Sequence, residues 1–161
     1  MDDDATHGAY GAAEPATGST AAPAGRPAEE SEREWLAEAA AVASRAYAPY
    51  SGFAVGAVAV APSGRRAAGV NVENASYPVG QCAERVALGS LVTAGERRLA
   101  AVAVAAADGG DLLPCGACLQ ALSEFGDPAI VARVGGRPTV FRLQELLRAP
   151  FGGHSAGGPQ A

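Results

Sequence analysis

Lysine is absent from the 161-residue chain, and its 12 basic side chains are all arginines. We read no function into the missing lysines themselves. Ten of the arginines lie beyond residue 34, where nine acidic residues nearly balance them. This part of the chain offers no broad basic face to neutralise phosphates, so a nucleic-acid polymer is a poor candidate partner.

The chain also lacks an apolar run close to the ~20 residues that a membrane-spanning helix needs. Its first residues contain neither a basic segment nor an apolar one, so they do not predict a secretory signal. Hydrophobic residues still make up 48% of the composition, which is enough for one folded domain. We therefore expect no membrane partner and a cytoplasmic location.

Cysteine and histidine are scarce. The three cysteines are Cys82, Cys115 and Cys118. In a disulfide framework, an odd number of cysteines would leave one cysteine unpaired. Three free thiols suit a reducing cytoplasm and a metal site. The two histidines, His7 and His154, lie near the chain ends, in segments that we predict to be outside the fold. The folded core would then have no imidazole.

Composition divides the chain into three parts. Residues 1–30 are rich in alanine, glycine, proline, threonine and acidic residues, and they predict a disordered acidic leader. Residues 153–161 are typical of a flexible tail. Residues 31–152 are predicted to form a single domain, in which patterns of helix and strand alternate.

The expected elements follow from hydrophobic patterns and turn residues. A helix is predicted to begin at Ser31, which forms a capping-box signature with Glu34. Residues 100–107 favour a strand, although periodicity alone leaves a helix open there. Further helices are expected over residues 82–94, 116–125 and 142–148, and further strands over 53–61, 67–72, 130–134 and 139–141. This alternation predicts a three-layer α/β/α sandwich around a mostly buried sheet.

All three cysteines fall into two short motifs, Cys82-Ala83-Glu84-Arg85 and Pro114-Cys115-Gly116-Ala117-Cys118. A Cys-x-x-Cys pair lets two thiolates reach one ion, and Cys82 can supply a third ligand from another helix start. A closed structural zinc site needs four protein ligands. Three ligands leave the fourth position to water, which is the arrangement of a catalytic zinc site, with one zinc ion per chain.

The residues around the cysteines fit catalysis at such a site. Helix starts favour thiolates, and Arg85 is a candidate hydrogen-bond donor to one of the thiolates that bind the metal. Water on the zinc could then ionise near neutral pH. Glu84 is the carboxylate close enough to move its proton. A zinc site with such a glutamate and a Pro-Cys-x-x-Cys pair is typical of zinc-dependent deaminases.

Five segments, in this order, resemble the small cytidine deaminases of nucleoside salvage: AYAPYSGFAVGA (46–57), GVNVENASYP (69–78), CAER (82–85), PCGAC (114–118) and QELLRAPFG (144–152). The resemblance covers roughly residues 31–152. It implies a five-stranded mixed sheet with helices on both faces, and a homotetramer with shared active sites. The implied reaction is hydrolytic deamination of cytidine or 2′-deoxycytidine to uridine or deoxyuridine plus ammonia, with zinc-bound hydroxide as nucleophile.

The resemblance also implies roles for individual residues. Asn71 and Glu73 would hydrogen-bond the ribose hydroxyls, and Phe53 would stack near the base. Ala83 and Glu84 would contact the pyrimidine edge. Tyr77 and Phe151 would help to close an active site, their own or a neighbour's.

Other interpretations stay open. Ala54, Gln81 and Leu119 depart from the family's usual residues and leave the exact nucleoside undecided. One alternative is a deaminase of a cytosine nucleoside antibiotic of the blasticidin S type, which has similar zinc motifs. Another is a non-catalytic zinc-binding scaffold of the same fold. The missing fourth ligand and Glu84 favour an enzyme, since a structural zinc site needs neither.

Overall fold

The structure is a computed structural model that describes residues 25–152. Most of the predicted leader, the whole predicted tail and both histidines lie outside the described residues. The elements are β1 (Arg26–Pro27), α1 (Glu30–Ala43), β2 (Val55–Val60), β3 (Arg66–Val70), the 3₁₀ helix η1 (Tyr77–Val79), α2 (Ala83–Thr93), β4 (Ala101–Ala106), α3 (Gly116–Ser123), β5 (Ala129–Val134), β6 (Arg137–Arg142) and α4 (Leu143–Leu146).

The strands form one mixed sheet in the order β1-β6-β5-β4-β2-β3. Only β4 and β5 are parallel, and all other neighbours are antiparallel. The expectation of five strands is met by β2 to β6, but β1 adds a sixth. A strand of two residues, one of them Pro27, has no alternating pattern that a sequence could reveal.

The start of the domain also differs from the prediction. The N-cap of α1 is Glu29, whose N–H donates to Glu32 Oε2 at 2.8 Å, so the capping box does not use Ser31 and Glu34. The same Glu32 carboxylate accepts two bonds from the guanidinium of Arg26, at 2.6 and 2.8 Å. Residues 25–30, which we predicted to be disordered, are therefore part of the folded domain.

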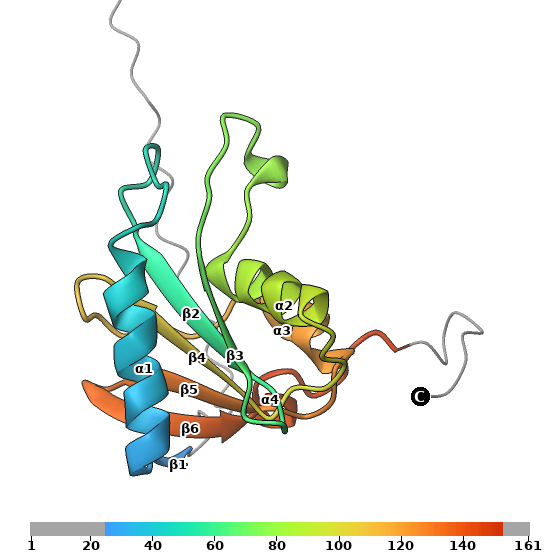
Figure 1. The fold of residues 1–161 in the computed structure, drawn as a ribbon. Helices are drawn as coiled ribbons and strands as arrows, with labels where there is room; N and C mark the ends of the chain where they lie inside the picture. Colours follow the sequence, from blue (N-terminus) through green and yellow to red (C-terminus); the bar gives the residue numbers. More distant parts are fainter. Residues whose placement is uncertain (1–24, 153–161) are drawn as a thin grey trace, which may run out of the picture.

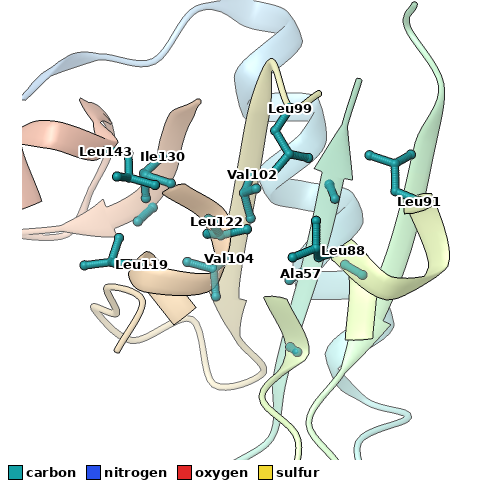
Figure 2. Packing of buried hydrophobic residues seen from close by; sticks show 14 of the residues in the cluster. Ala57, Leu88, Leu91, Leu99, Val102, Val104, Leu119, Leu122, Ile130 and Leu143 are labelled. Carbon is teal, nitrogen blue, oxygen red and sulfur yellow. The ribbon is translucent and has the colours of Figure 1, made fainter. Parts of the chain in front are cut away.

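Helices cover both faces of the sheet, as predicted for a three-layer sandwich (Figure 1). On β2, Val58 and Val60 pack in one cluster with Leu36 and Ala39 of α1. The alternate residues of β2 face a second cluster formed with α2 and α3. Figure 2 shows part of this second cluster, in which side chains from both helices meet those of β4 and β5; it includes Ala57, Leu88, Leu91, Val102, Val104, Leu119, Leu122 and Ile130.

Gly69 lets α2 lie directly on β3. A Cβ at this position would overlap the backbone of Ala83 and Ala87 in α2. Only glycine allows the two backbones to approach so closely. This contact fixes the height of the first turn of α2 above the sheet, which is where the CAER motif begins.

Two connections reach beyond the same end of the sheet (Figure 1): the one between α1 and β2, and the one between β3 and α2 that carries η1. They are held to each other by backbone bonds, since Tyr47 N–H donates to the Asn71 carbonyl at 3.0 Å and Glu73 N–H to the Tyr47 carbonyl at 2.8 Å. None of the helices within residues 25–152 has the length and apolar character to span a membrane.

Candidate active site

The three thiols come together at the N-termini of two neighbouring helices. Cys82 is the N-cap of α2, Cys115 is the N-cap of α3, and Cys118 lies in the first turn of α3. Their Sγ atoms all lie within 4.8 Å of one another. Sulfurs this close can bind one ion, and Zn²⁺ is the common divalent ion that prefers thiolate ligands.

Without a cation, most of this cluster does not favour the thiolate form. Burial, followed by the nearby charges of Glu84 and the other cysteines, raises the pKa of Cys118. Burial also raises the pKa of Cys82. Burial opposes ionisation of Cys115 as well, but hydrogen bonds from the backbone and thiol of Cys118 outweigh it and lower the pKa of Cys115. A divalent cation would supply the positive charge that three thiolates need.

Arg85, one helical turn after Cys82, has an unused donor. Its Nη2 donates to the Gly80 carbonyl at 3.1 Å, but its Nε is buried and has no hydrogen-bond partner among residues 25–152. Cys82 and Arg85 line the same pocket. A buried N–H without a partner is costly, and a thiolate of a zinc site would accept from it. The donor set therefore fits a zinc ion.

Glu84 lies beside this cluster in the first turn of α2, with only 4% of its surface exposed. Burial raises the pKa of its carboxyl group, although its own backbone N–H, the Cys118 thiol and the charge of Arg85 partly oppose the shift. A raised pKa brings a carboxyl group closer to neutrality, where it can both accept and donate a proton.

A pocket of about 210 Å³ opens in front of the cluster. Its lining brings together seven of the predicted site residues from four separate segments: Phe53, Asn71, Glu73, Cys82, Ala83, Glu84 and Cys115. Its walls are mostly apolar with a few polar groups, which is typical of a small-molecule site.

Asn71 and Glu73 are both tied to the loop before β2. Asn71 Nδ2 donates to the Phe53 carbonyl at 2.9 Å, and Asn71 Oδ1 accepts the Val55 N–H at 2.8 Å. Glu73 accepts a bond from the Ser51 hydroxyl, and this bond, followed by one from the Tyr50 N–H, lowers the pKa of its carboxyl group. Glu73 is therefore an ionised acceptor at the pocket wall at neutral pH.

Comparison with known proteins agrees with this geometry. Residues 29–134 match the family described as the cytidine and deoxycytidylate deaminase zinc-binding region. The chain belongs to this family. A cytidine deaminase of Mycobacterium tuberculosis is 44% identical over 110 residues, which cover 68% of this chain and 81% of that protein. One of Sporosarcina psychrophila is 43% identical over 119 residues, covering 72% and 88%.

A solved structure is similar as well. The crystal structure of cytidine deaminase from Burkholderia pseudomallei superposes with a TM-score of 0.68 at 41% identity, covering 74% of this chain and 98% of that one. The deaminase family match begins at residue 29. This agrees with the finding that the folded domain starts before Ser31.

Two residues that the family resemblance suggested do not reach the 210 Å³ pocket of this single chain. Tyr77 is 77% exposed and lines an adjacent pocket of about 550 Å³, with its ring 6.2 Å from that of Tyr50. Phe151 is 67% exposed. Its backbone forms two hydrogen bonds, of 2.7 and 2.8 Å, with the side chain of Gln120. Both remain predictions as residues that close an active site.

Several features of the site were not predicted from the sequence. Ser51, Leu112 and Leu113 line the pocket, and only Ser51 lay in a segment that resembles the deaminase family. Leu119, which departs from the family's usual residue, is 6% exposed in the core beneath α3. The unusual residue there thus faces the core, away from the pocket.

Proposed function

We propose that this protein is a zinc-dependent cytidine deaminase that converts cytidine and 2′-deoxycytidine to the uridine products and ammonia by hydrolysis. The observation that carries the proposal is the buried Glu84 carboxyl beside a cluster of three thiols. Within residues 25–152, this cluster contains no fourth ligand of the protein. A structural zinc site would need a fourth ligand and would have no use for a buried carboxyl.

Cys82, Cys115 and Cys118 would hold the zinc ion, and Arg85 Nε–H would donate to one of the thiolates. When bound, zinc supplies a Lewis acid that makes water nucleophilic near neutral pH. Glu84 would take the proton from the attacking water and pass it to the ring nitrogen N3. It would carry the second proton to the amino group as ammonia leaves. Burial of Glu84 suits this role, because its raised pKa makes both transfers accessible.

The other residues that line the pocket with Glu84 would bind the rest of the nucleoside. Phe53 would contact the base, the Ala83 backbone would contact the pyrimidine edge, and Asn71 and Glu73 would hydrogen-bond the sugar hydroxyls. The ionised Glu73 would repel a phosphate on the sugar, and no lysine is present to attract it. We therefore infer that nucleosides are preferred over both free cytosine and cytidine monophosphate.

The test is a comparison of kcat/KM, from ammonia release, for cytidine, deoxycytidine, cytosine, cytidine monophosphate and blasticidin S. We expect the two nucleosides to be the best substrates. If cytosine or the monophosphate were best, the assignment of the sugar site would be wrong. A preference for blasticidin S would retain the mechanism and replace the substrate class.

We also propose that the protein is a cytoplasmic homotetramer in which Tyr77 and Phe151 close active sites between subunits. Large apolar side chains are exposed around the 550 Å³ pocket, and such patches mark interfaces. Light scattering should give about four times the 16.0 kDa chain mass. A monomer that is fully active would contradict the shared active site.

A further inference from the structure

The hydroxyl group of Ser51 contacts two of the residues around the pocket. Ser51 Oγ donates to Glu73 Oε1, while the backbone N–H groups of Tyr50 and Ser51 donate to Glu73 Oε2 at 2.8 and 3.2 Å. Ser51 Oγ in turn accepts the N–H of Phe53 at 3.0 Å. One hydroxyl thus links the carboxylate at the pocket wall to the residue proposed to contact the base.

The link continues to Asn71, whose Nδ2 donates to the Phe53 carbonyl at 2.9 Å. A series of hydrogen bonds therefore runs from Glu73 through Ser51 and Phe53 to Asn71. All four residues line the 210 Å³ pocket together with Glu84. The series therefore connects four of the residues that line the same pocket as Glu84.

The bonds to Glu73 leave one of its oxygens available. An ionised carboxylate has about two acceptor positions on each oxygen. Oε2 accepts hydrogen bonds from two backbone N–H groups, so both of its acceptor positions are used. Among residues 25–152, the Ser51 hydroxyl is the one donor to Oε1. Oε1 thus keeps one acceptor position, and the Ser51 hydroxyl determines the direction in which it points.

No helix or strand holds the Glu73 side chain in place. Glu73 lies in the connection between β3 and α2, where its side chain would otherwise sample several rotamers. The bond from the Ser51 hydroxyl is the largest cause of the lowered pKa of Glu73. Together with the two backbone N–H bonds, this bond holds the carboxylate in one orientation.

We propose that Ser51 is a positioning residue for sugar recognition, because its hydroxyl holds Glu73 Oε1 and the Phe53 backbone where a nucleoside's sugar hydroxyls can meet them. The proposal rests on the proposed function. It predicts that loss of the Ser51 hydroxyl affects a substrate that has the sugar hydroxyls more than one that lacks them.

The test compares cytidine with 2′,3′-dideoxycytidine, which keeps the base but lacks the 2′ and 3′ hydroxyls that would donate hydrogen bonds to Glu73. Ser51→Ala should lower kcat/KM for cytidine by roughly tenfold, the scale of one hydrogen bond to a charged group. It should lower kcat/KM for dideoxycytidine by a clearly smaller factor, because that substrate loses only the effect of the Ser51 bond to the Phe53 N–H. Ser51→Thr, which keeps a hydroxyl, should restore the activity on cytidine.

Ser63→Ala is a matched control. In the turn between β2 and β3, Ser63 Oγ donates to the Glu96 carboxylate at 2.7 Å and accepts the N–H of Arg65 at 3.3 Å. Ser63 therefore bonds a carboxylate and the N–H two residues later, as Ser51 does. This turn does not line the pocket. Ser63→Ala should match the wild type on both substrates.

Two results would overturn the role of Ser51: an equal loss on both substrates in Ser51→Ala, or no loss on cytidine. A wild-type protein that does not turn over cytidine would contradict the proposed function instead. Calorimetric binding of the same two nucleosides would then decide the role of Ser51. A larger loss of binding for cytidine than for dideoxycytidine in Ser51→Ala supports it, and any other pattern, including no binding, contradicts it.

Discussion

Burial raises the pKa of Glu84 and so determines its capacity to accept and donate a proton. Its carboxyl group is 4% exposed and lies in the first turn of α2, where a charged group gains little from water. Glu84→Gln keeps the size and most polar contacts of the side chain but removes its ability to carry a proton. We expect this variant to retain zinc and its fold while turnover falls by roughly 10²–10⁴-fold.

Metal analysis and circular dichroism of Glu84→Gln, beside the kinetics, separate the two effects. Glu96→Gln is a suitable control, because Glu96 lies just beyond the C-terminal end of α2 and its carboxylate contacts Ser63 and Arg65. Near-normal turnover in Glu84→Gln would mean that another group moves the proton.

At this scale the sequence predicted what depends on local spacing. Cys115 and Cys118 are one helical turn apart, and Glu84 follows Cys82 within one motif, so their proximity could be read directly. The role of Ser51 could not, because its partner Glu73 lies 22 residues away in a different connection. Nothing in the residues around either position indicates that these two connections pair.

At the scale of elements, the position of α2 on the sheet depends on Gly69. A Cβ there would overlap the backbone of Ala83 and Ala87, which cannot move without shifting the whole helix. Gly69→Ala should therefore destabilise the fold by about 1–3 kcal/mol, as overpacking does. Because Cys82 and Glu84 lie at the start of α2, zinc affinity should fall as well.

Gly89→Ala provides the comparison, since Gly89 lies in the same helix with nothing near the position of a new Cβ. This variant should be neutral or slightly stabilised, because alanine favours a helix more than glycine does. Denaturant unfolding and zinc competition measure both effects. Equal behaviour of the two variants would contradict the close contact between α2 and β3.

The contact between β1 and α1 should depend on pH. The bond from Arg26 lowers the pKa of Glu32, with further help from the Glu29 N–H, although burial opposes it. A lowered pKa contributes stability above the unfolded pKa of about 4.3, and this contribution is lost as pH falls through the folded value. Glu32→Gln should thus destabilise by about 1 kcal/mol at pH 7, discounted because Arg26 is half exposed.

The difference between wild type and Glu32→Gln should shrink as pH falls below about 4.3. Glu34→Gln, an exposed change on the same helix, should show little effect at either pH. Unfolding free energies measured over this pH range test the prediction. A difference that stays constant to low pH would show that the charge of Glu32 is not involved.

The sequence predicted the longer elements well. Val55–Val60 and Ala101–Ala106 are buried apolar strands within two residues of the expected ends, and β4 proved to be a strand where helix had stayed open. β1 was missed because its two residues pair with β6, at the opposite end of the domain sequence. The cap of α1 was misplaced by two residues because Arg26 and Glu32 meet only once β1 is in the sheet.

At the scale of the whole molecule, the corrected start of the domain changes what truncation should do. Removing residues 1–30 takes away β1, the buried Ala28 and the N-cap Glu29, and should lower Tm by roughly 5 °C or more. Removing only residues 1–24 is expected, from their composition, to leave Tm and turnover close to those of the full chain. Equal Tm values for both truncations would contradict the role of β1.

The central claim is that the chain uses water to deaminate cytidine and that Glu84 moves the protons. The most direct measurement is turnover of cytidine in ¹⁸O-labelled water by the zinc-loaded protein, followed by mass spectrometry of the nucleoside and an assay of ammonia. We expect each uridine formed to carry one ¹⁸O and to be matched by one ammonia, with Glu84→Gln forming almost none. Unchanged cytidine, uridine without the label, or equal labelling by Glu84→Gln would contradict the account.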